Sequence, residues 1–439
     1  SGGAMGSISN LNPSQTVTDD TSREEAHAAT DSALYQGAEC TYAMFKELRL
    51  DSHYQPIFSL AHQRVIGFEA LMRATDADGR PRSPQEVFGN TRGYTDTVLL
   101  DRLCCATHLY NFARQDTAAA WLFLNINPRV IAEGRRSGSF LQAKLEQLGF
   151  PPERVVIEIV EAALADETVL VESVRHYRDL GCLIAIDDFG AGHSNFDRIC
   201  RLRPDIVKLD RSIVMQAAVD PGIRSIVPGM VSLLHESGSL VVMEGIETEY
   251  EAMVAMDADA DFVQGYYFAR PAPQATVTQA PAFGELFGQF RDMTLRERTG
   301  YRTEIAPYLN GMGYASVLLQ SSHPLEIACK GFLELPRAER CFLLDSDGRQ
   351  IGANINSPHA QVESDPRFAP LRHAAGANWS RRHYFRRAIS RPDKVQVTRP
   401  YLSAATATPC ITISIAFKVR GERRVLCGDL RWDEAHGSH

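Results

Sequence analysis

Short apolar runs alternate with helical patterns along the middle of the chain. The patterns at residues 169–180 and 221–235 are typical of amphipathic helices. Eight runs have the length and apolar content of strands: residues 54–60, 65–72, 121–126, 155–159, 183–186, 205–209, 240–243 and 262–268. The polar turn 61–64 joins the first two as a strand pair. Because strands and helices alternate, we expect an α/β fold with a mainly parallel sheet, and eight strands favour a closed, TIM-like (β/α)8 barrel over an open sheet.

The run at residues 183–186 ends abruptly in two adjacent carboxylates. Asp187 and Asp188 follow it directly, and Gly190 and Gly192 then loosen the backbone. The carboxyl ends of parallel strands are where α/β folds bind ligands. Two acids this close repel each other unless a cation lies between them. Taken alone, the stretch is explained equally well by a solvated Asp–Asp turn at the start of a helix.

Nearly every predicted strand carries or ends in a polar residue, although the rest of each strand is apolar. These residues are Glu69, Asn125, Glu158, Asp187, Asp188, Lys208, Glu244 and Gln264. One of them alone would be a satisfied core polar group, but their arrival from seven strands at one rim is hard to explain by structure alone. Five carboxylates and one amide oxygen favour Mg²⁺ or Mn²⁺, and the lack of His or Cys among them disfavours zinc. The adjacent Asp187 and Asp188 are suited to bridging two ions.

Composition limits the partners. The 439 residues carry a formal net charge of -8, which argues against broad binding to a nucleic acid polymer but allows a small anion held through metal. No apolar run approaches the roughly 20 residues of a membrane helix, so no membrane insertion is expected. The nine cysteines are scattered without a C-x-x-C pair, and no secretory signal is visible. These features predict free thiols and a cytoplasmic protein.

The ends of the chain predict further parts. We expect residues 1–20 to be disordered, and Thr21 with Glu24 to cap a helix that runs toward Leu48. The predicted division is an N-terminal tail and helix start at 1–38, the barrel at 39–273, a linker and connecting helix at 274–309, and a second domain at 310–434. The helical pattern of the connecting segment runs from Phe283 toward Tyr308.

The second domain is predicted to be a smaller α+β fold. A strand, a turn at Asp345–Gly348 and a second strand are followed by a hairpin around Gly421. A five-stranded sheet with flanking helices, of PAS or Cache type, accounts for this pattern. The segments FLLDSDGRQIGANI and WSRRHYFRRAI look similar to a Cache-type sensory domain, which implies an unknown small ligand. The arginine run from Arg381 to Arg391 could bind an anion, but a solvated helix face explains it without a ligand.

At the polar rim, the sequence resembles the EAL family of cyclic di-GMP phosphodiesterases. The signature triad is Glu69, Ala70 and Leu71, and NIN, EIVE, DDFG, KLD, EGIE and QGY follow in order over about residues 40–273. The triad alone would be weak, whereas the ordered set is specific. The resemblance implies metal-dependent hydrolysis of cyclic di-GMP to linear pGpG, with Mg²⁺ or Mn²⁺ as two ions, and a homodimer.

The resemblance also implies a role for each matched residue. One metal would be bound by Glu69, Asn125, Glu158 and Asp187, and the second by Asp187, Asp188 and Glu244. Lys208 would hold the attacking water, with Asp210 and Glu247 acting close by, and Glu244 could be a ligand only or also take the proton. The substrate side would comprise Gln55, Leu71, Arg73 and Gln264. Glu161 would steady the loop after the Asp pair and contribute to the dimer contact.

Two other functions fit parts of the pattern. A non-catalytic cyclic di-GMP receptor or dimeric signalling scaffold would keep the fold but lose ligands, and here every matched ligand position is filled, which favours the enzyme. A metal-dependent barrel enzyme of another chemistry, such as enolisation, is weakened by the match through QGY. We also expect the second domain to regulate the activity of the barrel.

Overall fold

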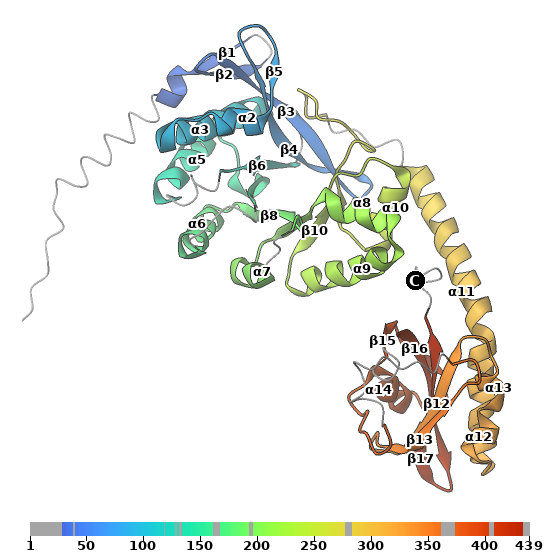
Figure 1. Cartoon of the computed structure of the whole chain (residues 1–439). Helices are drawn as coiled ribbons and strands as arrows, with labels where there is room; N and C mark the ends of the chain where they lie inside the picture. Colours follow the sequence, from blue (N-terminus) through green and yellow to red (C-terminus); the bar gives the residue numbers. More distant parts are fainter. Residues whose placement is uncertain are drawn as a thin grey trace, which may run out of the picture. The chain divides into compact units, whose positions relative to one another are not determined.

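The computed structural model (Figure 1) describes residues 29–37, 40–117, 119–127, 130, 134–160, 167–192, 196–276, 283–360, 374–403 and 408–432. The chain divides into two compact units, Ser1–Phe290 and Arg291–His439. Across the described ranges, no helix is both long and apolar enough to span a membrane. The disorder expected for residues 1–20 concerns a segment outside these ranges.

Eight strands of the first unit close into a barrel. They are β3 (Leu48–Ser59), β4 (Arg64–Thr75), β6 (Trp121–Asn125), β7 (Val155–Val160), β8 (Leu183–Phe189), β9 (Ile206–Leu209), β10 (Leu240–Met243) and β11 (Phe262–Val263). Strand β3 pairs antiparallel with β4 and β11, whereas all the other neighbours in the ring pair parallel. The predicted TIM-like barrel is confirmed, as is the strand pair that begins it.

Helices follow most of the barrel strands. They are α2 (Pro84–Gly89), α3 (Gly93–Ala113), α5 (Gly134–Leu148), α6 (Glu167–Asp179), α7 (Phe196–Leu202), α8 (Arg211–Val219), α9 (Pro221–Glu236) and α10 (Glu249–Asp257), with a 3-10 turn at Pro152–Arg154. The helices predicted at 169–180 and 221–235 are confirmed as α6 and α9. Their apolar faces join the strands in one large core, so the strands are covered on their outer side.

An apolar layer fills the inside of the barrel. Seven strands each contribute one buried residue to it: Ile57, Phe123, Val156, Ala185, Ile206, Val242 and Phe262. At the equivalent position of β4, Gly67 leaves room for the ring of Phe123, because a Cβ there would lie 2.7 Å from that ring. The barrel is therefore closed below its rim by packed side chains.

The helix predicted from Thr21 to Leu48 is wrong in its described part. Only residues 29–32 are helical, and β1 (Leu34–Gln36) and β2 (Thr41–Phe45) follow, with β5 (Pro81–Arg82) pairing at the far edge of β4. Burial alternates along β2, which is the period of a strand. Phe45 pairs with Leu48 across a two-residue turn, in which Lys46 has a φ of 56°. The hairpin formed by β2 and β3 therefore stands where the sequence predicted the end of a helix.

The last barrel strand is shorter than expected. The sequence predicts a strand over residues 262–268, but β11 ends at Val263, so Gln264 follows it. The chain turns because Gly265 lies directly against the backbone of Ile246, where a Cβ would come within 2.0 Å of the carbonyl oxygen. Backbone hydrogen bonds from Ile246 to Gln264 and from Tyr267 to Ile246 fix this close approach.

The second unit is a sheet with helices on both faces. The sheet has the order β13-β12-β17-β16-β14, and β15 also pairs with β16. Its strands are β12 (Ala338–Leu344), β13 (Gln350–Asn356), β14 (Gln396–Val397), β15 (Tyr401–Leu402), β16 (Pro409–Val419) and β17 (Glu422–Arg431). One core contains sheet residues together with α11 (Phe283–Gln320), α12 (Leu325–Ala328) and α13 (Lys330–Leu333), and another contains α14 (His383–Ser390).

Two expectations for this unit needed correction. The sheet has six strands rather than five, because β14 and β15 are separate two-residue strands on β16. The helix that begins at Phe283 does not end at Tyr308 but continues through Pro307 to Gln320. Met312 and Ala315 extend its buried face into the core, which explains the added length. The turn at Asp345–Gly348 and the hairpin around Gly421 are confirmed.

Candidate active site

The polar rim of the barrel follows from the two-residue period of a strand. In β6 to β10, the site residue lies two positions beyond the residue of the apolar layer, for example Glu158 after Val156 and Lys208 after Ile206. Glu69 stands in the same relation to Gly67 on β4, and Gln55 precedes its layer residue because β3 runs in the opposite direction. Residues two apart share a face of a strand. All the strands therefore present their polar groups on the same inner face, above the packed layer.

Asp188 reaches the same site by a different route. Neighbouring residues of a regular strand point to opposite faces, so Asp187 and Asp188 should diverge. The register between β8 and β9 shifts between Ile186 and Phe189, and Asp188 has a φ of 56° in this bulge. A bulge re-aims the side chain it carries. As a result, carboxylate oxygens of Asp187, Asp188 and Glu244 lie within 4.8 Å of one another.

Lys208 is at the centre of the cluster. Its side chain is buried, and its Nζ lies 2.5 Å from Oε1 of Glu158 and 2.7 Å from Oε1 of Glu244. The same atom is 3.2 Å from Oδ1 of Asp187 and 3.5 Å from Oε2 of Glu69. Burial alone would lower the pKa of Lys208, but these carboxylates raise it well above its usual value. The ammonium therefore stays charged and neutralises one of the surrounding acids.

The remaining acids are short of positive charge. Burial raises the pKa of Glu158 well above its usual range and that of Glu244 to about 8, even with Lys208 beside them. Burial and the charge of Asp187 raise the pKa of Asp188 to about 6. Within the described part of the chain, Oε2 of Glu158 is buried without a hydrogen-bond partner. These are the properties of carboxylates that fit additional cations, and their oxygen-only chemistry suits Mg²⁺ or Mn²⁺.

Glu69 orients two amides at the edge of the cluster. Its Oε1 accepts a hydrogen bond of 3.0 Å from Nδ2 of Asn125, and its Oε2 accepts one of 2.6 Å from Nε2 of Gln264. Because each amide nitrogen donates to Glu69, each amide oxygen is left to face other partners. The oxygen of Asn125 thereby remains available as a neutral ligand next to the carboxylates.

A cavity of about 300 Å³ opens above the cluster. Of the residues predicted for the site, nine line it: Gln55, Glu69, Asp187, Asp188, Lys208, Asp210, Glu244, Glu247 and Gln264. Glu158 and Asn125 reach the cluster without lining the cavity, through Lys208 and Glu69 respectively. Leu71 and Arg73, both half-buried on β4, do not line it, and Nη1 of Arg73 donates to the carbonyl of Met72. Glu161 lies outside the described residues.

Two side chains of the cavity wall were not predicted from the sequence. Arg211 is the first residue of α8, and its Nη2 lies 3.0 Å from Oε2 of Glu247. Tyr266 is exposed, with the guanidinium of Arg270 at 4.3 Å from its ring centre. Both residues adjoin predicted motifs, Arg211 directly after KLD and Tyr266 within QGY. Asp210 caps the same helix, because its Oδ1 accepts from the amide of Ser212 at 2.9 Å.

The chain is similar to a known family of signalling proteins. The sequence model of the EAL domain matches residues 41–271. The chain is 28% identical over 230 residues to the cyclic di-GMP phosphodiesterase RocR of Pseudomonas aeruginosa, which covers 51% of this chain and 58% of RocR. It is 30% identical over 238 residues to an uncharacterized protein of Azorhizobium caulinodans, which covers 51% of this chain and 31% of that protein. The chain thus spans less than two thirds of these relatives.

A similarity that extends into the second unit is found with YkuI of Bacillus subtilis, an uncharacterized EAL-domain containing protein. The two are 26% identical over 352 residues, which is 77% of this chain and 84% of YkuI. The crystal structure of YkuI in complex with substrate c-di-GMP and calcium has a TM-score of 0.73 to this chain at 23% identity. The superposition covers 88% of this chain and 96% of that one, and it shows a common fold.

Proposed function

The chain belongs to the EAL domain family, and on that premise we propose that it hydrolyses cyclic di-GMP to linear pGpG. The observation that carries the proposal is the cluster of five carboxylates around Lys208. Each position that the family resemblance assigns to a carboxylate ligand carries an aspartate or a glutamate. The similarity to RocR, a cyclic di-GMP phosphodiesterase, supports the choice of substrate.

The proposed metal ligands fall into two overlapping sets. Glu69, Asn125, Glu158 and Asp187 would hold one divalent ion, and Asp187, Asp188 and Glu244 the other, with Mg²⁺ or Mn²⁺ as the cations. When bound, the two ions supply positive charge to the phosphodiester oxygens and make the attacking water more acidic. The buried, partnerless Oε2 of Glu158 supports a ligand role for this residue.

The chain's own residues bind and orient the reactants. The ammonium of Lys208 has three N–H donors and is fixed by its carboxylate neighbours, so it would donate to the attacking water once those carboxylates bind the cations. Glu244 is the candidate to accept the proton from that water, because its carboxylate lies beside Lys208 and within the second ligand set. We place Asp210 and Glu247 in support of this centre, through the start of α8 and through Arg211.

The substrate would enter through the cavity above the cluster. Gln55 and Gln264 line it and are proposed to bind the dinucleotide, together with Leu71 and Arg73 on the adjoining strand β4. Arg211 adds a cation to the cavity wall, suited to a phosphate oxygen.

Three further properties belong to the same proposal. The second unit is proposed to be a PAS- or Cache-type sensory domain that binds a small ligand and tunes the barrel. The nine cysteines are all unpaired in the structure, which supports a reducing, cytoplasmic setting. A homodimer, with Glu161 linking it to the loop after the Asp pair, completes the proposal.

The test is an assay of the purified full chain with cyclic di-GMP. Products are separated by chromatography after incubation with Mg²⁺ or Mn²⁺, with excess EDTA, and with Ca²⁺. We expect pGpG with the first two ions, almost none with EDTA, and little with Ca²⁺, because Ca²⁺ prefers longer bonds and more ligands. Full activity in EDTA would contradict the proposal. Tight binding of cyclic di-GMP without product would instead favour the receptor function.

A further inference from the structure

A second cavity lies in the C-terminal unit, between the start of α14 and the segment before β15. Its volume is about 330 Å³, within the range of small-molecule sites. Arg382 and Arg387 line it from one segment, and Thr398, Arg399 and Tyr401 line it from the other. Among the described residues of its wall, three are arginines and none is an aspartate or a glutamate. The protein as a whole has a net charge of -8, so this wall is a local excess of positive charge.

No carboxylate of the described residues neutralises the arginines of this wall. In the described ranges, none of the three forms an ion pair with a carboxylate, and two are held in place by other contacts. Nη1 of Arg387 donates to the carbonyl oxygen of Val397 at 3.1 Å. The guanidinium of Arg382 lies 5.9 Å from the ring centre of Tyr401. Guanidinium groups that converge without a counter-charge are suited to bind an anion through several charge-assisted hydrogen bonds.

A tyrosine hydroxyl without a hydrogen-bond partner among the described residues also lies at this wall. Tyr384 is only 4% exposed, and its ring packs against Phe342 and Tyr401 at 6.0 and 6.4 Å between ring centres. It lines both the arginine-lined cavity and a smaller one of about 40 Å³ behind it. Its hydroxyl has no hydrogen-bond partner among the described residues. Because Tyr384 lines the cavity, this hydroxyl can donate a hydrogen bond to a ligand there.

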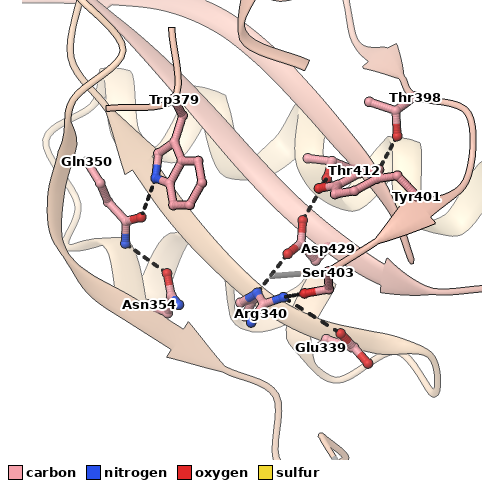
Figure 2. Close-up of polar contacts among 10 residues, drawn as sticks. All are labelled: Glu339, Arg340, Gln350, Asn354, Trp379, Thr398, Tyr401, Ser403, Thr412 and Asp429. Atoms are coloured by element: carbon pink, nitrogen blue, oxygen red, sulfur yellow. Dashed lines mark hydrogen bonds and ion pairs between the residues drawn. The ribbon is translucent and has the colours of Figure 1, made fainter. Parts of the chain in front are cut away.

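In the smaller cavity, by contrast, one arginine of the wall, Arg340, is paired with a buried carboxylate (Figure 2). Nε of Arg340 donates to Oδ2 of Asp429 at 2.7 Å, and Thr412 donates to Oδ1 of Asp429 at 2.7 Å. The hydroxyl of Tyr401 lies 2.5 Å from that of Thr412, and Arg340 also contacts Ser403. The network fixes Tyr401, whose side chain lines both cavities, and it gives Arg340 carboxylate partners in Asp429 and Glu339. Arg382, Arg387 and Arg399 have no such partner among the described residues, so the larger cavity is the one suited to an anion.

We propose that the arginine-lined cavity binds a small organic anion that carries two or more carboxylate or phosphate groups. Three arginines match more than one anionic group, and the cavity is larger than a single phosphate needs. Tyr384 would donate its hydroxyl to the same ligand. This site is separate from the barrel chemistry, so the proposal stands or falls independently of hydrolysis.

The experiment is isothermal titration of the full chain without cyclic di-GMP. Metal is removed by gel filtration rather than with EDTA, because EDTA is itself a polycarboxylate and could occupy the proposed site. The probes are citrate, a sugar bisphosphate, inorganic phosphate and an uncharged sugar, each at low and high NaCl. We expect saturable binding of citrate or the bisphosphate with a Kd below about 1 mM, weakened by salt, and none of the sugar. Comparison of citrate with the sugar bisphosphate shows whether the site prefers carboxylate or phosphate groups.

Variants locate the site. We expect R387A and R399A each to weaken binding about tenfold, and Y384F several-fold, by the loss of a hydrogen bond to an anion. R386A is the matched control, because Arg386 is exposed on the same helix but does not line the cavity, and it should stay within twofold. Melting curves confirm that each variant is folded. The proposal is overturned if none of the anions binds, or if R386A weakens binding as much as R399A does.

Discussion

The two units each contain a buried polar cluster built on sheet strands, and the clusters differ in their balance of charge. In the barrel, five carboxylates surround one ammonium, that of Lys208. In the second unit, Arg340 and Asp429 form a pair, and uncompensated arginines lie on the far side of Tyr401. The first cluster has an excess of acid and the second region an excess of base.

This difference indicates what each region binds. In the barrel, buried charges are stable only when they are paired, so the excess of acid predicts cations. In the second unit, Arg387 and Arg399 are exposed, and an anion is favoured because three guanidinium groups line one cavity. The barrel would take divalent cations and the second unit an anion. The inner pair of Arg340 and Asp429 needs neither, and its role is to hold the wall between the cavities. The predictions that follow remove charge from each region in turn.

The largest effect is expected at the barrel carboxylates. Glu69→Ala or Asp187→Ala should lower turnover of cyclic di-GMP by about a thousandfold or more, because each leaves the cations short of ligand charge. Asp197→Ala is the matched control, since Asp197 is exposed on α7 in a pair with Arg201, and it should stay within about twofold. Turnover is measured by chromatography of the product. Wild-type rates in both variants would contradict the assignment of the cluster as the metal site.

Removal of the Lys208 ammonium should make the stability of the barrel depend on bound metal. Lys208→Met leaves buried acids unpaired, which should lower the free energy of unfolding by about 3 kcal/mol in metal-free protein. Mn²⁺ should restore much of this loss, because it supplies the missing charge. Urea unfolding with and without Mn²⁺ measures both effects, and Lys330→Met, at an exposed lysine of α13, is the control. An unchanged midpoint in metal-free Lys208→Met would show that the ammonium is not needed for charge balance.

A smaller effect is expected in the balanced network. Arg340→Met should destabilise the second unit by about 3 kcal/mol, since Asp429 is left buried without its cation. The double variant that also carries Asp429→Leu should be less destabilised than the single one, because both charges are gone. Hydrolysis should change by less than about threefold in either. Urea unfolding of the wild type, Arg340→Met, Asp429→Leu and the double variant tests this, and a double variant as unstable as the sum of the two singles would contradict the pairing.

The sequence predicted the parts of this comparison that depend on short periods. The succession of strands predicted that Glu158 and Lys208 lie at one rim, and the two-residue period of a strand explains why the structure has both on the inner face. Asp188 shares that rim only because of a bulge with positive φ, a conformation that the Asp–Asp pair alone does not specify. Arg399 joins Arg387 through tertiary packing across a gap in sequence. The arginine run by itself was better explained by a solvated helix face than by an anion site.

The smallest effect is expected from removal of the second unit. A chain that ends at Phe290 keeps Phe283 and Leu286, which pack in the barrel core, and every residue of the rim. It should retain metal-dependent hydrolysis, with a rate changed several-fold, as allosteric coupling typically allows. Turnover is compared with the full chain at equal protein and metal concentrations. A folded, monodisperse barrel without any activity would show that the second unit is part of the active site or of an obligatory dimer.

The most direct test of the charge argument is a count of cations bound at the barrel. Metal-free full chain is titrated with Mn²⁺, and bound ion is measured by calorimetry and by the loss of the free-ion paramagnetic resonance signal. The account predicts two ions per chain, at most one in Asp188→Asn, and an unchanged count in Asp197→Asn. A chain that binds no Mn²⁺ at millimolar concentration, or binds it equally after loss of Asp188, would contradict it.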